Sequence, residues 1–91
     1  MNIIVRNNTE LPNKYVRFIK WKIYKLKEKF NHLIYAEVHL NAEGNFRQRY
    51  TSNLRLGVSG HDIIIKNQSH NIGEILRDLD KSAHRYLRKR K

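Results

Sequence analysis

The chain has 91 residues, with 19 Lys and Arg against 8 Asp and Glu, and a formal net charge of +11. This length suits one domain over residues 1–91 with one hydrophobic core, which favours a surface binder over an enzyme with a deep substrate cavity. Cysteine is absent, which excludes disulfides, thiolate metal sites and a cysteine nucleophile. The charge favours a polyanionic partner.

No segment resembles an export signal or a membrane span. Residues 1–6 lack a charged start followed by a long apolar run, and no stretch approaches the roughly 18 apolar residues that a membrane helix needs. We therefore expect a cytoplasmic protein without a membrane partner.

The first 40 residues predict a strand, a helix and a second strand. Residues 2–6 are a β-branched run that ends in the polar residues 7–9, which predicts a strand and then a turn. A helix is expected from about Pro12, because proline fits the first helical turn. Residues 33–40 alternate between apolar and polar side chains, as a half-buried strand requires. The side chains expected in the core are Tyr15, Val16, Ile19, Ile23, Leu26 and Phe30 from the helix, and Ile34, Ala36, Val38 and Leu40 from the strand.

The remaining residues predict a hairpin and a second helix. A turn at residues 41–45 leads into a long alternating strand over 49–58, and residues 59–62 reverse the chain into a strand at 63–65. Asn71 and Glu74 resemble a capping box at the start of a helix that runs to the C-terminus. Its expected apolar face consists of Ile72, Ile75, Leu76, Leu79, Ala83 and Leu87. The order β-α-β-β-β-α predicts an α+β fold, a four-stranded mixed sheet with both helices packed on one face.

The basic residues gather in the two expected helices rather than in the strands. On the second helix, five side chains fall within a sector of about 80°; they are Arg77, Lys81, His84, Arg85 and Arg88. The last eleven residues hold six bases and no acid, although like charges on one helix repel. A phosphate backbone would neutralise this repulsion, while bases in the last turn also suit the helix dipole. We weight a binding surface above a generic solvated face.

Trp21 and Tyr24 lie off the apolar face of the first helix, next to Arg17. Large aromatic side chains exposed to water call for a reason. Two interpretations stay open: stacking on an unpaired base or on a partner protein, and cover by a loop or by the chain end.

No cluster of reactive side chains emerges from the sequence. The five histidines lack the spacing of a metal site; they are His32, His39, His61, His70 and His84. The segment Gly57–Gly60 is better explained by a hairpin turn than by a nucleophile elbow. His61 and Asp62 would suit a nuclease, but one such pair in a turn is weak evidence. We therefore expect no catalysis, no metal and no cofactor.

Two segments carry residues in an order typical of one family. The first helix reads Phe18-Ile19, Lys22-Ile23, Lys25-Leu26 and Phe30, and the second region reads Gly60, Asp62-Ile63, Asn71, Arg85, Leu87 and Lys89. Over nearly the whole chain, this ungapped order resembles the ribosome hibernation family, which includes the short hibernation promoting factors and protein Y. Trp21 and Tyr24 depart from the family pattern, which has smaller side chains there.

The resemblance implies a fold similar to the double-stranded-RNA-binding domain and a partner, the small ribosomal subunit with its ribosomal RNA. A family member would occupy the messenger and transfer RNA channel during stress or stationary phase. It would be a monomer off the ribosome and, ending at residue 91, would lack the additional domain of the long members. The RNA-binding residues carried over are Lys22, Lys25, Arg85, Arg88 and Lys89. The charge pattern adds Lys29, Arg77, Lys81, Arg90 and Lys91 to the predicted set.

Two other functions stay open from the sequence. A general structured-RNA-binding or RNA chaperone module would bind any duplex with a steep salt dependence. A small RNA-cleaving enzyme would use His61 and Asp62.

Overall fold

The structure is a computed structural model that describes residues 2–44 and 47–89. Its elements in chain order are β1 (Asn2–Asn8), α1 (Asn13–Lys29), β2 (Leu33–Glu43), β3 (Arg49–Val58), β4 (His61–Ser69) and α2 (Ile72–Lys89). The predicted α+β fold and its element order are confirmed.

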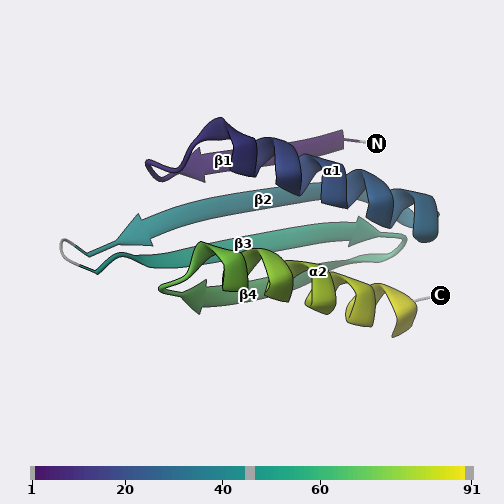
Figure 1. Ribbon diagram of the computed structural model, residues 1–91. Coiled ribbons are helices and arrows are strands. Elements are labelled where there is room, and N and C mark those ends of the chain that lie inside the picture. The colour runs from purple at the N-terminus through teal and green to yellow at the C-terminus, as the bar shows by residue number, and fades with distance from the viewer. Residues whose placement is uncertain (1, 45–46, 90–91) are drawn as a thin grey trace.

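The four strands form one sheet in the order β1-β2-β3-β4. β1 pairs with β2 in parallel, and the other two pairs are antiparallel, so the sheet is mixed as predicted. Both helices lie on the same face and run in the same direction, α1 against β1 and β2, and α2 against β3 and β4 (Figure 1). The opposite face is not covered by any helix of the described residues, and we call it the open sheet face.

α1 begins where the sequence predicts. Pro12 is its N-cap residue in an extended conformation (φ −60°, ψ 154°), and the helix starts at the next residue. At the other end, the Lys27 Nζ donates to the carbonyls of Asn31 and Leu33, both at 2.7 Å. This lysine therefore satisfies carbonyl oxygens just beyond the helix end.

β1 is longer than predicted. It extends to Asn8 instead of ending near residue 6, because Asn7 and Asn8 pair in register with Leu40 and Asn41 of β2. The backbone of Asn7 belongs to the strand, and its side chain stabilises the turn that follows. The Asn7 Nδ2 donates to the carbonyl of Leu11 (3.0 Å).

Both hairpin turns are tighter than predicted. Residues 41–43 continue β2 opposite β3, so the turn expected at 41–45 begins only at Gly44 (φ 102°), and residue 45 lies outside the described part. The next reversal uses Ser59–Gly60, because residues 61–62 already belong to β4. Gly60 has a φ of 92°, which suits glycine in such a turn.

Ile34 was expected in the core and is instead exposed. The register of β2 against β3 shifts between Leu33 and Tyr35, so Leu33 takes the buried position and 55% of Ile34 is exposed. A bulge changes which face each side chain points to. From Ala36 onward the predicted alternation is confirmed.

The core fills the space between the sheet and the helices. The helices contribute Ile19, Ile23, Leu26 and Phe30 from α1, and Ile75, Leu79, Ala83 and Leu87 from α2. Each of the larger side chains stabilises the fold by about 1.5–3 kcal/mol when fully buried. Because these apolar faces fix how each helix is rotated, they also determine which charged side chains face solvent.

The start of α2 contains half of the predicted capping box. The Oδ1 of Asn71 accepts a hydrogen bond from the Gly73 N–H (2.8 Å). Glu74 does not return the contact, because the backbone N–H of Asn71 donates to the Ser69 hydroxyl (3.1 Å). That hydroxyl in turn donates to the Glu74 carboxylate (2.5 Å), so Ser69 supplies the missing half.

Candidate RNA-binding surface

The outer side of α2 carries a continuous basic stripe, which we call the α2 stripe (Arg77, Lys81, His84, Arg85 and Arg88). Ile75, Leu79, Ala83 and Leu87 are buried on the opposite side of the helix. Four members of the stripe line one shallow hollow together with Asp80; they are Lys81, His84, Arg85 and Arg88. The helical spacing that predicts the stripe therefore brings most of it into one concave surface.

Backbone hydrogen bonds orient two members of this stripe. The His84 Nδ1 donates to the carbonyl of Asp80 (2.8 Å), and the Arg88 Nε donates to the carbonyl of His84 (3.3 Å). Both contacts reach back one helical turn. They hold the side chains against the helix and leave the remaining guanidinium N–H groups of Arg88 for an anionic ligand.

α1 provides a second row of cations. It has seven Lys and Arg and one acid, Glu28. Glu28 pairs with Lys25 across one turn (3.8 Å), with both side chains largely exposed, so the pair is weak. Within the described residues, α1 therefore contributes a strongly positive surface beside the α2 stripe.

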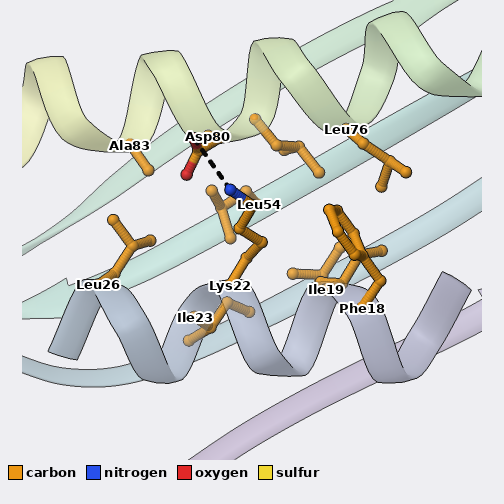
Figure 2. A pocket seen from close by; sticks show the side chains of 11 residues that line it. Phe18, Ile19, Lys22, Ile23, Leu26, Leu54, Leu76, Asp80 and Ala83 are labelled. Atoms are coloured by element: carbon orange, nitrogen blue, oxygen red, sulfur yellow. Dashed lines mark ion pairs between the residues drawn. The ribbon is translucent and has the colours of Figure 1, made fainter. Parts of the chain in front are cut away.

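Lys22 bridges the two helices. Its Nζ lies 3.7 Å from the Oδ2 of Asp80, as the dashed line in Figure 2 shows. The Oδ1 of Asp80 also lies 3.5 Å from the Nδ1 of His84. Asp80 was not among the site residues predicted from the sequence. The available signal was its position, because Asp80 is an acid four residues before His84 on a helix rich in basic residues.

The groove below this ion pair is filled by apolar side chains. Its free volume is about 30 Å³, which is space for about two water molecules. The lining shown in Figure 2 includes Ile19, Ile23 and Leu26 from α1 and Leu76 and Ala83 from α2. A small-molecule ligand does not fit there, so the chemistry of this face lies on its surface.

The predicted site residues fall into three groups. Lys22 and Lys25 have carboxylate partners. In residues 2–44 and 47–89, no carboxylate lies within ion-pair distance of the next group, which consists of Lys29, Arg77, Lys81, Arg85, Arg88 and Lys89. Arg90 and Lys91 lie outside the described residues.

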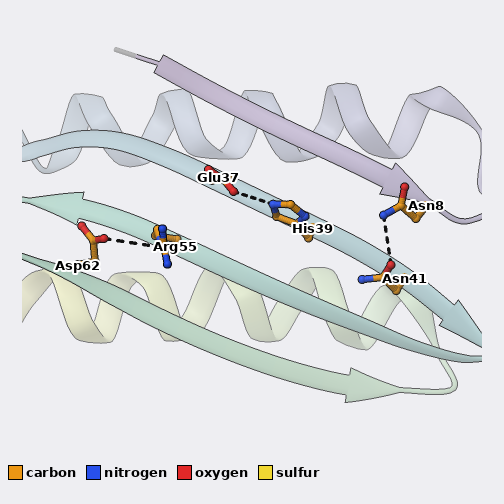
Figure 3. Close-up of polar contacts among 6 residues, drawn as sticks. All are labelled: Asn8, Glu37, His39, Asn41, Arg55 and Asp62. Atoms are coloured by element: carbon orange, nitrogen blue, oxygen red, sulfur yellow. Dashed lines mark hydrogen bonds and ion pairs between the residues drawn. The ribbon is translucent and has the colours of Figure 1, made fainter.

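The open sheet face has a different character (Figure 3). Several of its charged groups pair with one another: the Glu37 carboxylate with the His39 Nε2 at 2.7 Å, and the Asp62 carboxylate with the Arg55 Nε at 3.7 Å. Acids and bases are mixed on this face, so the positive potential of the molecule comes mainly from the helical side.

Trp21 and Tyr24 are exposed to 53% and 56%, respectively. Within the described residues no loop covers either ring. Phe18, which the sequence did not propose as a site residue, is exposed to 40% and its ring centroid lies 6.2 Å from that of Trp21. Phe18 and Trp21 are three positions apart on one helix, and this separation in the sequence could have predicted their contact.

His61 and Asp62 do not converge with other reactive groups. The Asp62 carboxylate is hydrogen-bonded to the Tyr35 hydroxyl, which raises the pKa of Tyr35, with burial as a further cause. Among the residues described, no group of three or more His, Cys, Asp or Glu side chains has the geometry of a metal site. Neither α1 nor α2 is long and apolar enough to cross a membrane.

Comparisons with known proteins identify the fold. No protein-family model matches the chain, and no curated protein matches its sequence. A ribosomal subunit interface protein from Coxiella burnetii superposes with a TM-score of 0.69 at 11% identity, covering 100% of both chains. The N-terminal domain of Protein Y from Thermus thermophilus gives 0.65 at 15% identity, covering 97% of this chain and 90% of that one. The fold expected from the resemblance to the ribosome hibernation family is thereby confirmed: this chain has the fold of these two proteins.

Proposed function

We propose that the chain binds the small ribosomal subunit through its helical face and silences translation during stress or stationary phase. The observation that carries this proposal is the α2 stripe, in which Lys81, His84, Arg85 and Arg88 line one hollow. It occurs on a fold shared with a ribosomal subunit interface protein and with the N-terminal domain of Protein Y. The ligand is the phosphate backbone of ribosomal RNA.

Inhibition is by occupancy of the messenger and transfer RNA channel. α1 and α2 run side by side in the same direction (Figure 1), so each helix presents a row of cations that follows a phosphate backbone. Contacts of this kind position a protein on RNA and require no base to be read. The protein acts as a monomer in the cytoplasm and needs no cofactor.

Sedimentation with ribosomes tests this proposal. The wild-type chain should co-sediment with intact ribosomes at physiological salt and reduce the transfer RNA in the decoding site. Arg85→Glu with Arg88→Glu should weaken binding by about a hundredfold, because each lost phosphate contact also becomes a repulsion.

The open sheet face offers a matched control. Arg6→Glu with Lys66→Glu makes the same change of charge on exposed side chains of β1 and β4. This variant should sediment with ribosomes as the wild type does. Equal loss of binding in both variants would assign the effect to net charge, and a wild-type protein that stays at the top of the gradient would overturn the proposal.

The alternative function is general binding of structured RNA. It is favoured by the shallow surface, because the groove between the helices has only about 30 Å³ of free volume and offers no pocket for a base. Competition separates the two functions: bulk duplex RNA in excess releases a general binder from ribosomes and leaves a ribosome-specific protein bound.

We also propose that the chain is not an enzyme. Asp62, the acid of the adjacent His61–Asp62 pair, is engaged by Arg55 and Tyr35, which leaves it poorly placed as a general acid or base. Ribosomal RNA incubated with excess protein should stay intact over hours, and discrete cleavage products that disappear in His61→Ala would contradict this.

A further inference from the structure

Three large aromatic side chains on α1 are partly exposed to solvent. Phe18, Trp21 and Tyr24 are exposed to 40%, 53% and 56%, respectively, while Ile19 and Ile23 fill the buried side of the same helix. Phe18 also lines the apolar groove between the helices, whereas more than half of Trp21 and of Tyr24 is exposed. Exposed rings gathered on one surface are typical of a binding site.

Phe18 and Trp21 form a pair that is surrounded by cations. Their ring centroids are 6.2 Å apart, with the planes tilted by 42°. The Lys22 Nζ lies 5.8 Å from the Phe18 centroid and 5.6 Å from that of Trp21, and the Lys25 Nζ lies 5.6 Å from Trp21. We call the two rings with these two lysines the α1 platform.

The α1 platform is continuous with the α2 stripe. Phe18 and Lys22 line a second hollow together with Leu76, Arg77 and Asp80 of α2. Figure 2 shows Phe18 and Leu76 at the same end of the groove between the helices. The Phe18 ring and the Arg77 side chain therefore share one hollow, so a ligand that contacts Arg77 can reach the α1 platform.

We infer that the α1 platform binds an unpaired nucleotide of single-stranded RNA, with its base stacked on Trp21 or Phe18 and its phosphate held by the lysines. This inference rests on the proposed RNA-binding function and adds the kind of RNA. A nucleotide combines a flat aromatic face with a negative charge, which matches rings and cations placed 5–6 Å apart.

Other occupants match this surface less well. Bases inside a duplex already stack on their neighbours, so their flat faces are not available to the rings of a protein. A purely apolar protein partner would take Lys22 and Lys25 out of water with only their long contacts to Asp80 (3.7 Å) and Glu28 (3.8 Å) as compensation, which is costly. An acidic peptide satisfies the lysines but leaves the rings without a flat partner.

Trp21 is the single tryptophan of the chain, so its fluorescence reports on the α1 platform alone. The probes are a 12-nucleotide RNA without self-complementarity and the same RNA annealed to its complement. The single strand should quench Trp21, and the duplex should bind through the α2 stripe with little quenching. Trp21→Leu should weaken binding of the single strand by about five- to a hundredfold, as expected for one lost base stack, and leave duplex binding within about twofold.

Trp21→Phe keeps an aromatic ring and should bind the single strand within about threefold of the wild type. If only the size of the side chain matters, Trp21→Phe and Trp21→Leu should have equal affinity for the single strand. Equal quenching by the duplex, or by a polyglutamate peptide, would overturn the inference. If Trp21→Leu binds the single strand as the wild type does, while Arg85→Glu/Arg88→Glu loses RNA binding, the inference is overturned and the proposed function stands. If the wild type binds neither RNA nor ribosomes, the inference and the proposed function are both overturned.

Discussion

Glu37 and His39 lie two positions apart on β2, so the pleat of the strand directs both side chains to the open sheet face. The His39 Nε2 lies 2.7 Å from the Glu37 Oε1. This hydrogen bond is the main cause that lowers the pKa of Glu37, assisted by the charges of His39, Arg55 and Arg6 and opposed by desolvation. At the scale of single residues, a histidine two positions away on the same strand thus stabilises the Glu37 carboxylate.

The lowered pKa of Glu37 makes part of the stability depend on pH. Because the folded carboxyl gives up its proton more readily than the unfolded one, its contribution is full above its ordinary pKa of 4.5. The contribution is lost as the pH falls below 4.5 through the folded pKa. NMR titration of the Glu37 carboxyl should therefore give a midpoint below 4.5.

His39→Ala should raise the titration midpoint of Glu37 toward its ordinary value, because the variant lacks the hydrogen bond that contributes most to the lowered pKa of Glu37. His61→Ala is the control, since His61 is exposed at the start of β4. A Glu37 midpoint that does not change in His39→Ala would contradict the assignment.

Between elements, Tyr35 of β2 reaches across β3 toward β4. It lies opposite Gly57, which in turn lies opposite Asp62. A Cβ added at Gly57 would lie 2.0 Å from the Cε1 of Tyr35, so the ring occupies the space that a side chain there would need. A glycine in a strand interior often marks such a close approach.

Gly57→Ala should therefore lower the free energy of unfolding by about 1–2 kcal/mol, because the Tyr35 ring must leave its position. The same change in a Tyr35→Thr background should cost almost nothing. Urea denaturation of the four proteins of this double-mutant cycle gives the coupling. Equal costs in both backgrounds would place the strain elsewhere.

The order of elements followed from the sequence because the changes of period are clear: helical spacing from Tyr15 to Phe30, then alternation from residue 36 to 40. The bulge at Ile34 was not predictable, because Leu33 and Ile34 are both apolar and the alternation of apolar and polar residues does not show which of them is buried. Strand ends were also missed, because Asn7, Asn41 and Glu43 are polar yet pair with neighbouring strands, Asn7 with β2 and the other two with β3. Pairing across the sheet decides such positions.

On the scale of the whole molecule, charge is segregated by face. The helical side carries the α2 stripe and the cations of α1, and the open sheet face pairs acids with bases (Figure 3). The sequence predicted the stripe because it depends on helical spacing alone. It did not predict that Lys22 and Asp80 pair between the helices, since the relative rotation of two helices depends on core packing.

Salt dependence should report this segregation. Arg85→Ala with Arg88→Ala should reduce the slope of log affinity against log salt by about 1–2, because each phosphate contact contributes about 0.7–0.9. Arg6→Ala with Lys66→Ala should leave the slope of ribosome binding unchanged. A larger effect of the second pair would assign the RNA contact to the open sheet face.

The parallel pairing of β1 has a consequence for the order of folding. β1 joins the sheet only through β2, and Asn2 pairs with Tyr35, beyond the whole of α1. The meander from β2 to β4 closes through short turns, whereas β1 must wait for a long loop to close, which is slow. We expect the meander to form first and β1 to dock last. Until then β2 is an unpaired edge, the segment through which an incompletely folded chain would pair with a second copy and aggregate.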